Sequence, residues 1–232
     1  DGRLIAPVEE KSFEIEKQNS MKAGEVDLDD FCLKCPCENG KILVSVMEYA
    51  GKTLSITRCV QEEHEVKDGM VVLGENEAFV AVINRHGKGT RAVGVVRNFG
   101  LREGAVASTV SHDSHNLTIV YFRPEDALAA ARELIACGGG MTAVKDGKVL
   151  HTLRLEVAGL MTRLEAQELS REAAAMKEVE RSLGLTDMEN PLLRIVTLAL
   201  PVIPDVKMSD LGLVSVAEQK LIPIFPECGT EK

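Results

Sequence analysis

The sequence predicts an α+β fold, in which mixed and antiparallel β-sheets are flanked by helices in a layered α/β domain without a TIM barrel. Short runs of Val, Ile, Leu and Ala recur between glycine-containing turns, which is typical of strands. Two other segments show the spacing of apolar residues that indicates helices. The chain has 232 residues, 45% of them hydrophobic, which is enough for a proper core.

The first half of the chain predicts a lead-in followed by a run of strands. Residues 1–40 are polar and rich in charge, and we expect a lead-in segment with short strands. The core domain is expected to span residues 41–226, followed by a tail over residues 227–232. Alternation and β-branched residues predict strands over residues 41–47, 53–57, 70–73, 78–83 and 92–96.

The second half predicts two helices between further strands. Pro124 at a first helical position and Gly138 after the last turn predict a helix over residues 124–137. An Asp146-Gly147 turn predicts a hairpin, and Thr162 with Glu165 reads as a capping box before a helix that ends at Gly184. Strands are expected at the remaining apolar stretches, which are residues 105–110, 117–122, 195–204 and 212–216.

The composition excludes several classes of partner. The chain carries 36 acidic and 27 basic residues, and its net charge is −9 without a clustered Lys/Arg stripe. This balance repels phosphate backbones and acidic bilayers, so we expect no nucleic-acid and no membrane partner. No apolar run reaches the roughly 18 to 20 residues of a membrane span, and no signal-peptide core is present. The expected location is cytoplasmic, with the six cysteines reduced.

The strongest candidate site is the polar heptad V-S-H-D-S-H-N of residues 110–116, which separates two apolar runs. Its imidazoles and carboxylate can serve as metal ligands, as acid/base groups or as partners of a heterocyclic ligand. In an extended chain His112 and His115 would face opposite ways, so they can act together only if the backbone turns between them. The alternative interpretation is an Asx-type turn whose polar side chains cap the backbone.

Two other stretches carry weaker signals. Residues 84–89 (N-R-H-G-K-G) follow an apolar run and could place cations and backbone N–H groups against an anion or a carbonyl oxygen, or form a basic hairpin tip. Cys32, Cys35 and Cys37 could join a zinc or iron–sulfur site, but no fourth ligand stands at a familiar spacing. Solvent-facing thiols are the alternative for these three residues.

Several unusual motifs, taken in order, resemble the C-terminal domain of bacterial and archaeal adenine deaminases, which are members of the amidohydrolase superfamily. The resemblance covers most of residues 40–226 and does not include the cysteine motif. The motifs that carry it are residues 84–87, 94–101, 104–116, 138–140, 157–161, 201–204 and 222–225.

The resemblance implies a reaction and a partner for this domain. The implied reaction is hydrolysis of adenine to hypoxanthine and ammonia by a metal-bearing barrel, with a divalent metal pair of Mn, Fe or Zn. This chain has no room for a barrel, so the barrel is expected on the same gene or on a separate chain, and this chain alone is expected to be inactive. The lead-in 1–40 is similar to part of the small β-domain that follows the barrel. The resemblance also implies a homo-oligomer.

The resemblance also assigns expected roles to residues of the polar motifs. We expect His112, Asp113 and His115 to be catalytic, and no metal ligand in this chain. The expected substrate-binding residues are Arg85, His86, Ser111 and Asn116. Two alternatives stay open: a free-standing purine-binding or assembly module without catalysis, and a metal site formed by His112, Asp113 and His115 themselves.

Overall fold

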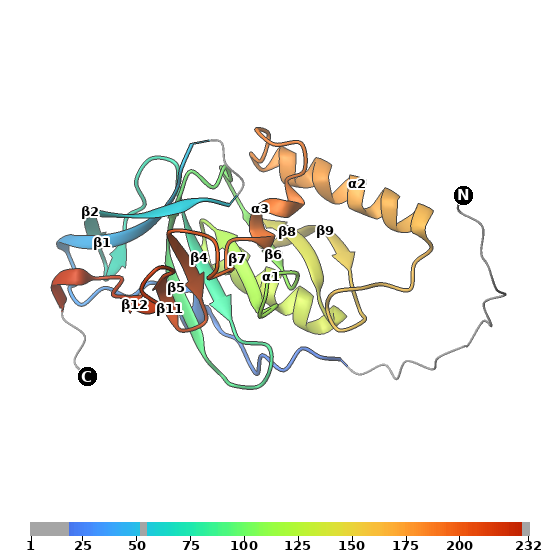
Figure 1. Ribbon diagram of the computed structural model, residues 1–232, viewed down its shortest axis with the longest axis horizontal. Helices are drawn as coiled ribbons and strands as arrows, with labels where there is room; N and C mark the ends of the chain where they lie inside the picture. The colour runs from blue at the N-terminus through green and yellow to red at the C-terminus, as the bar shows by residue number, and fades with distance from the viewer. Residues whose placement is uncertain (1–18, 52–54, 229–232) are drawn as a thin grey trace.

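The computed structural model describes residues 19–51 and 55–228, which are built around a nine-stranded mixed sheet (Figure 1). Its strand order is β3-β2-β1-β5-β4-β7-β6-β8-β9, and every neighbouring pair is antiparallel except the parallel pair β1–β5. The strands are β1 (Gly40–Tyr49), β2 (Thr57–Lys67), β3 (Met70–Val71), β4 (Glu77–Ile83), β5 (Arg91–Arg97), β6 (Ala105–Ser108), β7 (Leu117–Tyr121), β8 (Gly140–Lys145) and β9 (Lys148–Arg154).

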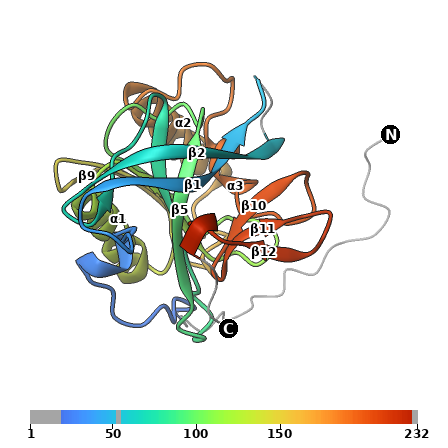
Figure 2. The same cartoon turned by 90° about the vertical axis from the view of Figure 1, so that its left-hand side faces the viewer.

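Helices and a second, smaller sheet complete the fold. The small antiparallel sheet has the order β10-β11-β12 and lies beside β5 (Figure 2). These elements are η1 (Leu28–Phe31), α1 (Pro124–Cys137), α2 (Ala166–Ser182), α3 (Leu192–Val196), β10 (Val206–Ser209), β11 (Gly212–Ser215), β12 (Lys220–Ile222) and η2 (Pro226–Cys228). The structure therefore confirms the predicted α+β class, with helices flanking a mixed sheet and no closed barrel among the described residues.

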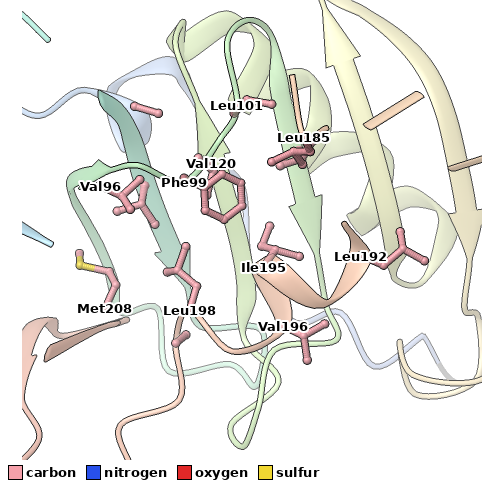
Figure 3. Packing of buried hydrophobic residues seen from close by; sticks show 14 of the residues in the cluster. Val96, Phe99, Leu101, Val120, Leu185, Leu192, Ile195, Val196, Leu198 and Met208 are labelled. Atoms are coloured by element: carbon pink, nitrogen blue, oxygen red, sulfur yellow. The ribbon is translucent and has the colours of Figure 1, made fainter. Parts of the chain in front are cut away.

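Strand β4 shows how the sheet divides the interior into two cores. All seven of its residues are buried, and alternate side chains enter opposite faces. Val80 and Val82 belong to one core, which α2 and α3 cover, whereas Phe79 and Ala81 belong to the other, which α1 and η1 cover. Figure 3 shows the first core, where Leu192, Ile195 and Val196 of α3 gather with Phe99, Val120 and Leu185.

The lead-in contributes to the second core. Phe31 is fully buried, its ring meets Tyr121 edge-on at 6.1 Å, and its carbonyl accepts a hydrogen bond of 2.8 Å from the Tyr121 hydroxyl. Met21 and Leu33 are buried in the same cluster. Cys32, Cys35 and Cys37 are half-buried. Residues 19–35 thus pack on the same sheet as the later part of the chain, while the first residues, including Asp1-Gly-Arg-Leu-Ile-Ala, lie outside the described part.

Two local predictions are confirmed in detail. Helix α1 begins at Pro124 and ends before Gly138, whose φ of 88° allows its N–H to reach the carbonyl of Leu134. The β8–β9 hairpin turns at Asp146 and Gly147, with φ values of 52° and 72° that suit a two-residue turn. Buried Asp126 of α1 accepts a hydrogen bond of 2.7 Å from the Gly147 N–H, so the helix and the hairpin support each other. No helix among the described residues is long and apolar enough to cross a membrane.

Two other local predictions are wrong. The capping box is absent, because Glu165 is itself the residue before α2 and makes no side-chain cap, while the Thr162 hydroxyl accepts from the N–H of Leu164 at 3.3 Å. The strand expected at residues 195–204 is instead the end of α3 followed by turns. Pro191 precedes this helix. The side chains of Leu192, Ile195 and Val196 share one face of the helix, and this face packs in the first core.

Helix α2 holds a buried acid. Glu180 is 2% exposed, and its Oε2 has no hydrogen-bond partner among the described residues. Burial raises the pKa of this carboxyl from 4.5 to about 8. In the unfolded chain the group ionises near 4.5, so its contribution to the free energy of unfolding falls as the pH rises from about 4.5 to about 8.

We expect Glu180→Gln to stabilise the protein in a pH-dependent way. Near pH 5 the two proteins should unfold at similar urea concentrations, since Glu180 is then protonated in the folded state. Near pH 8 the variant should be more stable by about 2 to 4 kcal/mol, because it carries no carboxyl to keep protonated. Urea unfolding followed by circular dichroism measures both values. Glu178→Gln, at a 72% exposed side chain on the same helix, is the control; an equal gain at both pH values would contradict the assignment.

Candidate functional site

Two of the three stretches singled out in the sequence meet at one end of the large sheet. Strands β4 and β7 are antiparallel neighbours, and the last residue of β4, Ile83, pairs with the first of β7, Leu117. The segment after Ile83, which contains Arg85 and His86, therefore leaves the sheet beside the segment that precedes Leu117. Strand pairing thus brings residues 84–90 and 109–116 together although about thirty residues separate them.

The polar loop turns back on itself instead of running extended. The N–H of His115 donates to the carbonyl of Ser111 at 2.7 Å, and the N–H of Ser111 donates to Nδ1 of His115 at 3.3 Å. The rings of His112 and His115 consequently lie 5.2 Å apart, edge to face. The N–H of His112 also donates to the carbonyl of Val196 at 3.0 Å, which ties the loop to α3. The turn that lets both histidines act on one side is therefore present.

The exposed groups of the site come from both loops. His86, His112, Asp113 and Ser114 are exposed, and His115 is half-buried. Nε2 of His86 donates to the carbonyl of Ser114 at 2.7 Å, which bridges the two loops. The structure thus brings together three imidazoles and one carboxylate that the sequence places in two separate motifs.

Arg85 lies beneath these groups and is 3% exposed. Its Nε donates to the carbonyl of His115, Nη1 to the hydroxyl of Ser20 at 2.9 Å, and Nη2 to the carbonyl of Ala158 at 2.9 Å. A Cβ at Gly159 would lie 3.0 Å from Nη1, so a side chain there would press on the guanidinium. Arg85 therefore joins the lead-in, the polar loop and the turn at residues 157–161.

Ser111 and Asn116 are also buried, at 0% and 1% exposure. The Ser111 hydroxyl shares a hydrogen bond of 2.8 Å with the hydroxyl of Thr118 in β7. The side-chain oxygen of Asn116 has no hydrogen-bond partner among the described residues. A buried amide oxygen without a partner is uncommon, and it leaves Asn116 with an acceptor to offer.

The electrostatic surroundings keep His115 neutral. Its pKa is lowered from 6.5, first by burial and then by the positive charges of His112 and Arg85, while the Asp113 carboxylate acts in the opposite direction. A neutral ring that accepts the Ser111 N–H at Nδ1 carries its proton on Nε2. His115 can therefore donate a hydrogen bond from Nε2 near neutral pH.

The backbone of His115 lies in the left-handed region, with a φ of 50°. The hydrogen bond that Arg85 donates to the His115 carbonyl holds the backbone in this conformation.

No group of three His, Cys, Asp or Glu side chains placed to hold a metal ion occurs in residues 19–51 and 55–228. This applies both to the histidine loop and to the motif of Cys32, Cys35 and Cys37.

Sequence reasoning missed the residues that support the site. Ser20, Ala158 and Val196 contribute through hydroxyl or carbonyl groups, and almost any residue can supply a carbonyl. Asp210, at the tip of the β10–β11 hairpin, accepts from the side chains of Asn84, at 3.0 Å, and Thr90. Of these supporting residues, only Ala158 lies in a motif that carries the resemblance, residues 157–161.

Known proteins match this chain over the region that contains the candidate site. The sequence model of the adenine deaminase C-terminal domain matches residues 55–220. Adenine deaminase 2 of Carboxydothermus hydrogenoformans is 33% identical over 97% of this chain and 40% of that protein. Adenine deaminase of Moorella thermoacetica is 39% identical over 84% of this chain and 33% of that protein. Adenine deaminase of Halalkalibacterium halodurans is 41% identical over 72% of this chain and 29% of that protein.

The chain thus spans at most about 40% of the length of these curated relatives. The match nevertheless includes both polar loops, the strands that pair them and the turn that contacts Arg85. This chain belongs to the adenine deaminase C-terminal domain family.

Proposed function

We propose that this domain works as part of an adenine deaminase, which hydrolyses adenine to hypoxanthine and ammonia. Its two polar loops would close or line the purine site, while a metal-bearing barrel outside this chain performs the hydrolysis. One observation carries the proposal: His86, His112, Asp113 and His115 converge at one end of the sheet on a rigid support. Such a concentration of titratable groups is typical of a functional site.

The proposed roles follow from exposure and hydrogen bonding. His112 and Asp113 are exposed and would orient the purine or a neighbouring metal ligand, and Nε2–H of His115 would move a proton as ammonia leaves. His86 is exposed and would contact the substrate directly. Asn116 is 1% exposed, so its amide, which matches the donor and acceptor of an adenine edge, would reach the purine only after the loop moves. Arg85 and Ser111, being buried and engaged with the chain, would position the loop.

The implied metal pair of Mn, Fe or Zn does not fit the described residues of this chain, which offer no group of three ligands. We therefore assign the metals to the barrel. The part left to this domain is to bind and orient the purine, to exclude water and to hold a proton at Nε2 of His115. A cytoplasmic location, expected from the composition, and a homo-oligomeric state, implied by the resemblance, belong to the same proposal.

A second candidate is a free-standing purine-binding or assembly module that lacks catalysis. The exposed side chains of His86, His112 and Asp113 would offer a polar heterocycle hydrogen-bond partners even without the barrel. Two results together would favour this candidate. Calorimetry would show that the isolated chain binds adenine, and neither the chain nor its complex with the barrel would release ammonia. Release of ammonia on addition of the barrel would favour the first.

We expect His112→Ala and His115→Ala to lower kcat at least about tenfold in an enzyme that joins this domain to the barrel, because a positioned proton donor contributes about 10²–10⁴ to the rate. The melting temperature should change little for His112→Ala, whose side chain is exposed. Steady-state ammonia release and thermal unfolding measure the two effects. Asp187→Ala, in the exposed loop after α2, should leave both unchanged. Unchanged kinetics in both histidine variants would reject the site.

We expect Arg85→Ala to lower the free energy of unfolding by about 2 to 5 kcal/mol, because three acceptors lose a charged donor. The ring resonances of His112 and His115 should broaden or shift, since the backbone below them is released. Urea unfolding and NMR of the isolated chain measure these effects. Arg171→Ala, at an exposed position on α2, should cost less than about 1 kcal/mol. A variant as stable as the original protein would contradict the positioning role.

We expect the His115 ring to titrate below 6.5 in NMR of the isolated chain, since burial and nearby positive charge disfavour its protonated form. Asp113→Asn should lower the midpoint further, because it removes the one neighbouring carboxylate that raises the pKa of His115. The distant Asp187→Asn serves as the control and should not move the midpoint. A midpoint that rises in Asp113→Asn would refute this account of the electrostatics.

A further inference from the structure

The loop that carries His86 is held at its base by a residue of the small sheet. Asp210 lies at the tip of the β10–β11 hairpin and is half-buried. Its Oδ2 accepts a hydrogen bond of 3.0 Å from Nδ2 of Asn84 and another from the hydroxyl of Thr90. The backbone joins the same two residues, since the N–H of Asn84 donates to the carbonyl of Thr90 at 2.9 Å. One carboxylate oxygen thus binds both ends of the loop 84–90.

Asn84 transmits this contact to the backbone of His86. Asn84 is 4% exposed, and its Oδ1 accepts from the N–H of His86 at 3.0 Å and from the N–H of Lys88 at 3.2 Å. This is an Asx-type turn, in which a side-chain oxygen fixes the backbone that follows. An amide has its oxygen on one side and its donors on the other, and an ionised carboxylate only accepts. Asp210 therefore sets the orientation in which the amide oxygen faces the His86 N–H.

The residues around His86 in the loop do little to restrain it. Gly87 and Gly89 have φ values of 87° and 71°, which glycine adopts freely, and a Cβ at Gly89 would meet no atom within 4 Å. The side chain of His86 is exposed, so burial does not hold it either. Its Nε2 nevertheless donates to the carbonyl of Ser114 at 2.7 Å, which requires a defined position of the backbone. The hydrogen bond from the His86 N–H to Asn84 supplies that restraint.

The small sheet can support the loop because it is anchored in the first core. Met208 of β10 is 1% exposed and packs in that core (Figure 3). Gly94 of β5 makes room for it, since a Cβ at Gly94 would lie 3.3 Å from the Met208 sulfur. At the tip of the hairpin the hydroxyl of Ser209 donates to the carbonyl of Gly212 at 2.9 Å. Asp210 is therefore presented to the loop from a fixed hairpin.

We propose that Asp210 is a positioning residue of the candidate site: through the Asn84 amide it holds the His86 backbone where the ring can bridge to the polar loop. The small sheet is then part of the site. The two loops have separate supports, because the side chain of Arg85 holds the polar loop, whereas Asp210 holds the loop of His86. The effect of this positioning on a bound purine rests on the proposed function; the positioning itself does not.

The first test follows the ring of His86 and the amides of His86 and Lys88 by NMR in the full 232-residue chain. Asp210→Ala removes the acceptor, so these resonances should shift or broaden as the turn loosens. Asp210→Asn keeps an oxygen that can accept from both donors, and its spectrum should stay close to that of the original chain. Glu218→Ala, at an exposed acid in the turn between β11 and β12, is the control and should change none of these resonances.

Circular dichroism and thermal unfolding verify that each variant is folded. Asp210→Ser should behave like Asp210→Ala, because the Ser oxygen stands short of both donors, and it decides the question if Asp210→Ala does not fold. Resonances of His86 and Lys88 that stay in place in the folded variant would overturn the proposal. An Asp210→Asn variant displaced as far as Asp210→Ala would overturn it as well.

A second test separates the positioning role from the proposed function. In an enzyme that joins this domain to the barrel, Asp210→Ala should raise the KM for adenine about twofold to tenfold, the loss expected with one hydrogen bond, and should change kcat less. Asp210→Asn should leave both constants near their original values. A displaced His86 with an unchanged KM would support the positioning role and contradict only the substrate contact proposed for His86. A His86 that stays in place while KM rises would overturn the positioning role and leave that contact standing.

Discussion

The buried guanidinium of Arg85 is the interaction on which the candidate site depends. A charge removed from water is tolerated only when its donors are satisfied, and Arg85 satisfies three of them with His115, Ser20 and Ala158. Those partners belong to three different segments: the polar loop, the lead-in and the turn at residues 157–161. If the polar loop shifts, Arg85 must lose its hydrogen bond to the loop or its hydrogen bonds to the other two segments. The positions of the histidine rings therefore depend on a buried cation below them.

The sheet supplies the second constraint. Because β4 is fully buried and pairs with β5 and β7, the ends of these strands are fixed to a single register. The two polar loops leave the sheet at the same edge, and their side chains meet without a long connecting segment. The range that the family model matches, residues 55–220, includes both of these loops.

Features that depend on residues close together in the sequence could be predicted, whereas features that depend on distant residues could not. Helix α1 and the turn at Asp146-Gly147 were predictable, because Pro124, Gly138 and the turn residues encode their local geometry. The short helix α3 was not, since its Ile and Val residues suit a strand equally well, and only burial against the sheet decides between the two. The histidine loop was located as a polar stretch between strands, but its turn and its contact with His86 depend on strand order and on Arg85. Those contacts join distant parts of the chain and leave no local pattern.

The parallel pair β1–β5 has a consequence for the order of folding. Val46 lies opposite Val95, so this junction between the β1–β2 hairpin and the rest of the sheet closes a loop of about fifty residues. The hairpin β1–β2 and the hairpin β4–β5 are each local and can form early, whereas their union must wait for a search over a long chain segment. Until that search ends, the apolar edges of both hairpins are bare. The edges of β1 and β5, which lie side by side in the folded sheet, are therefore open to pairing with another chain until this junction closes.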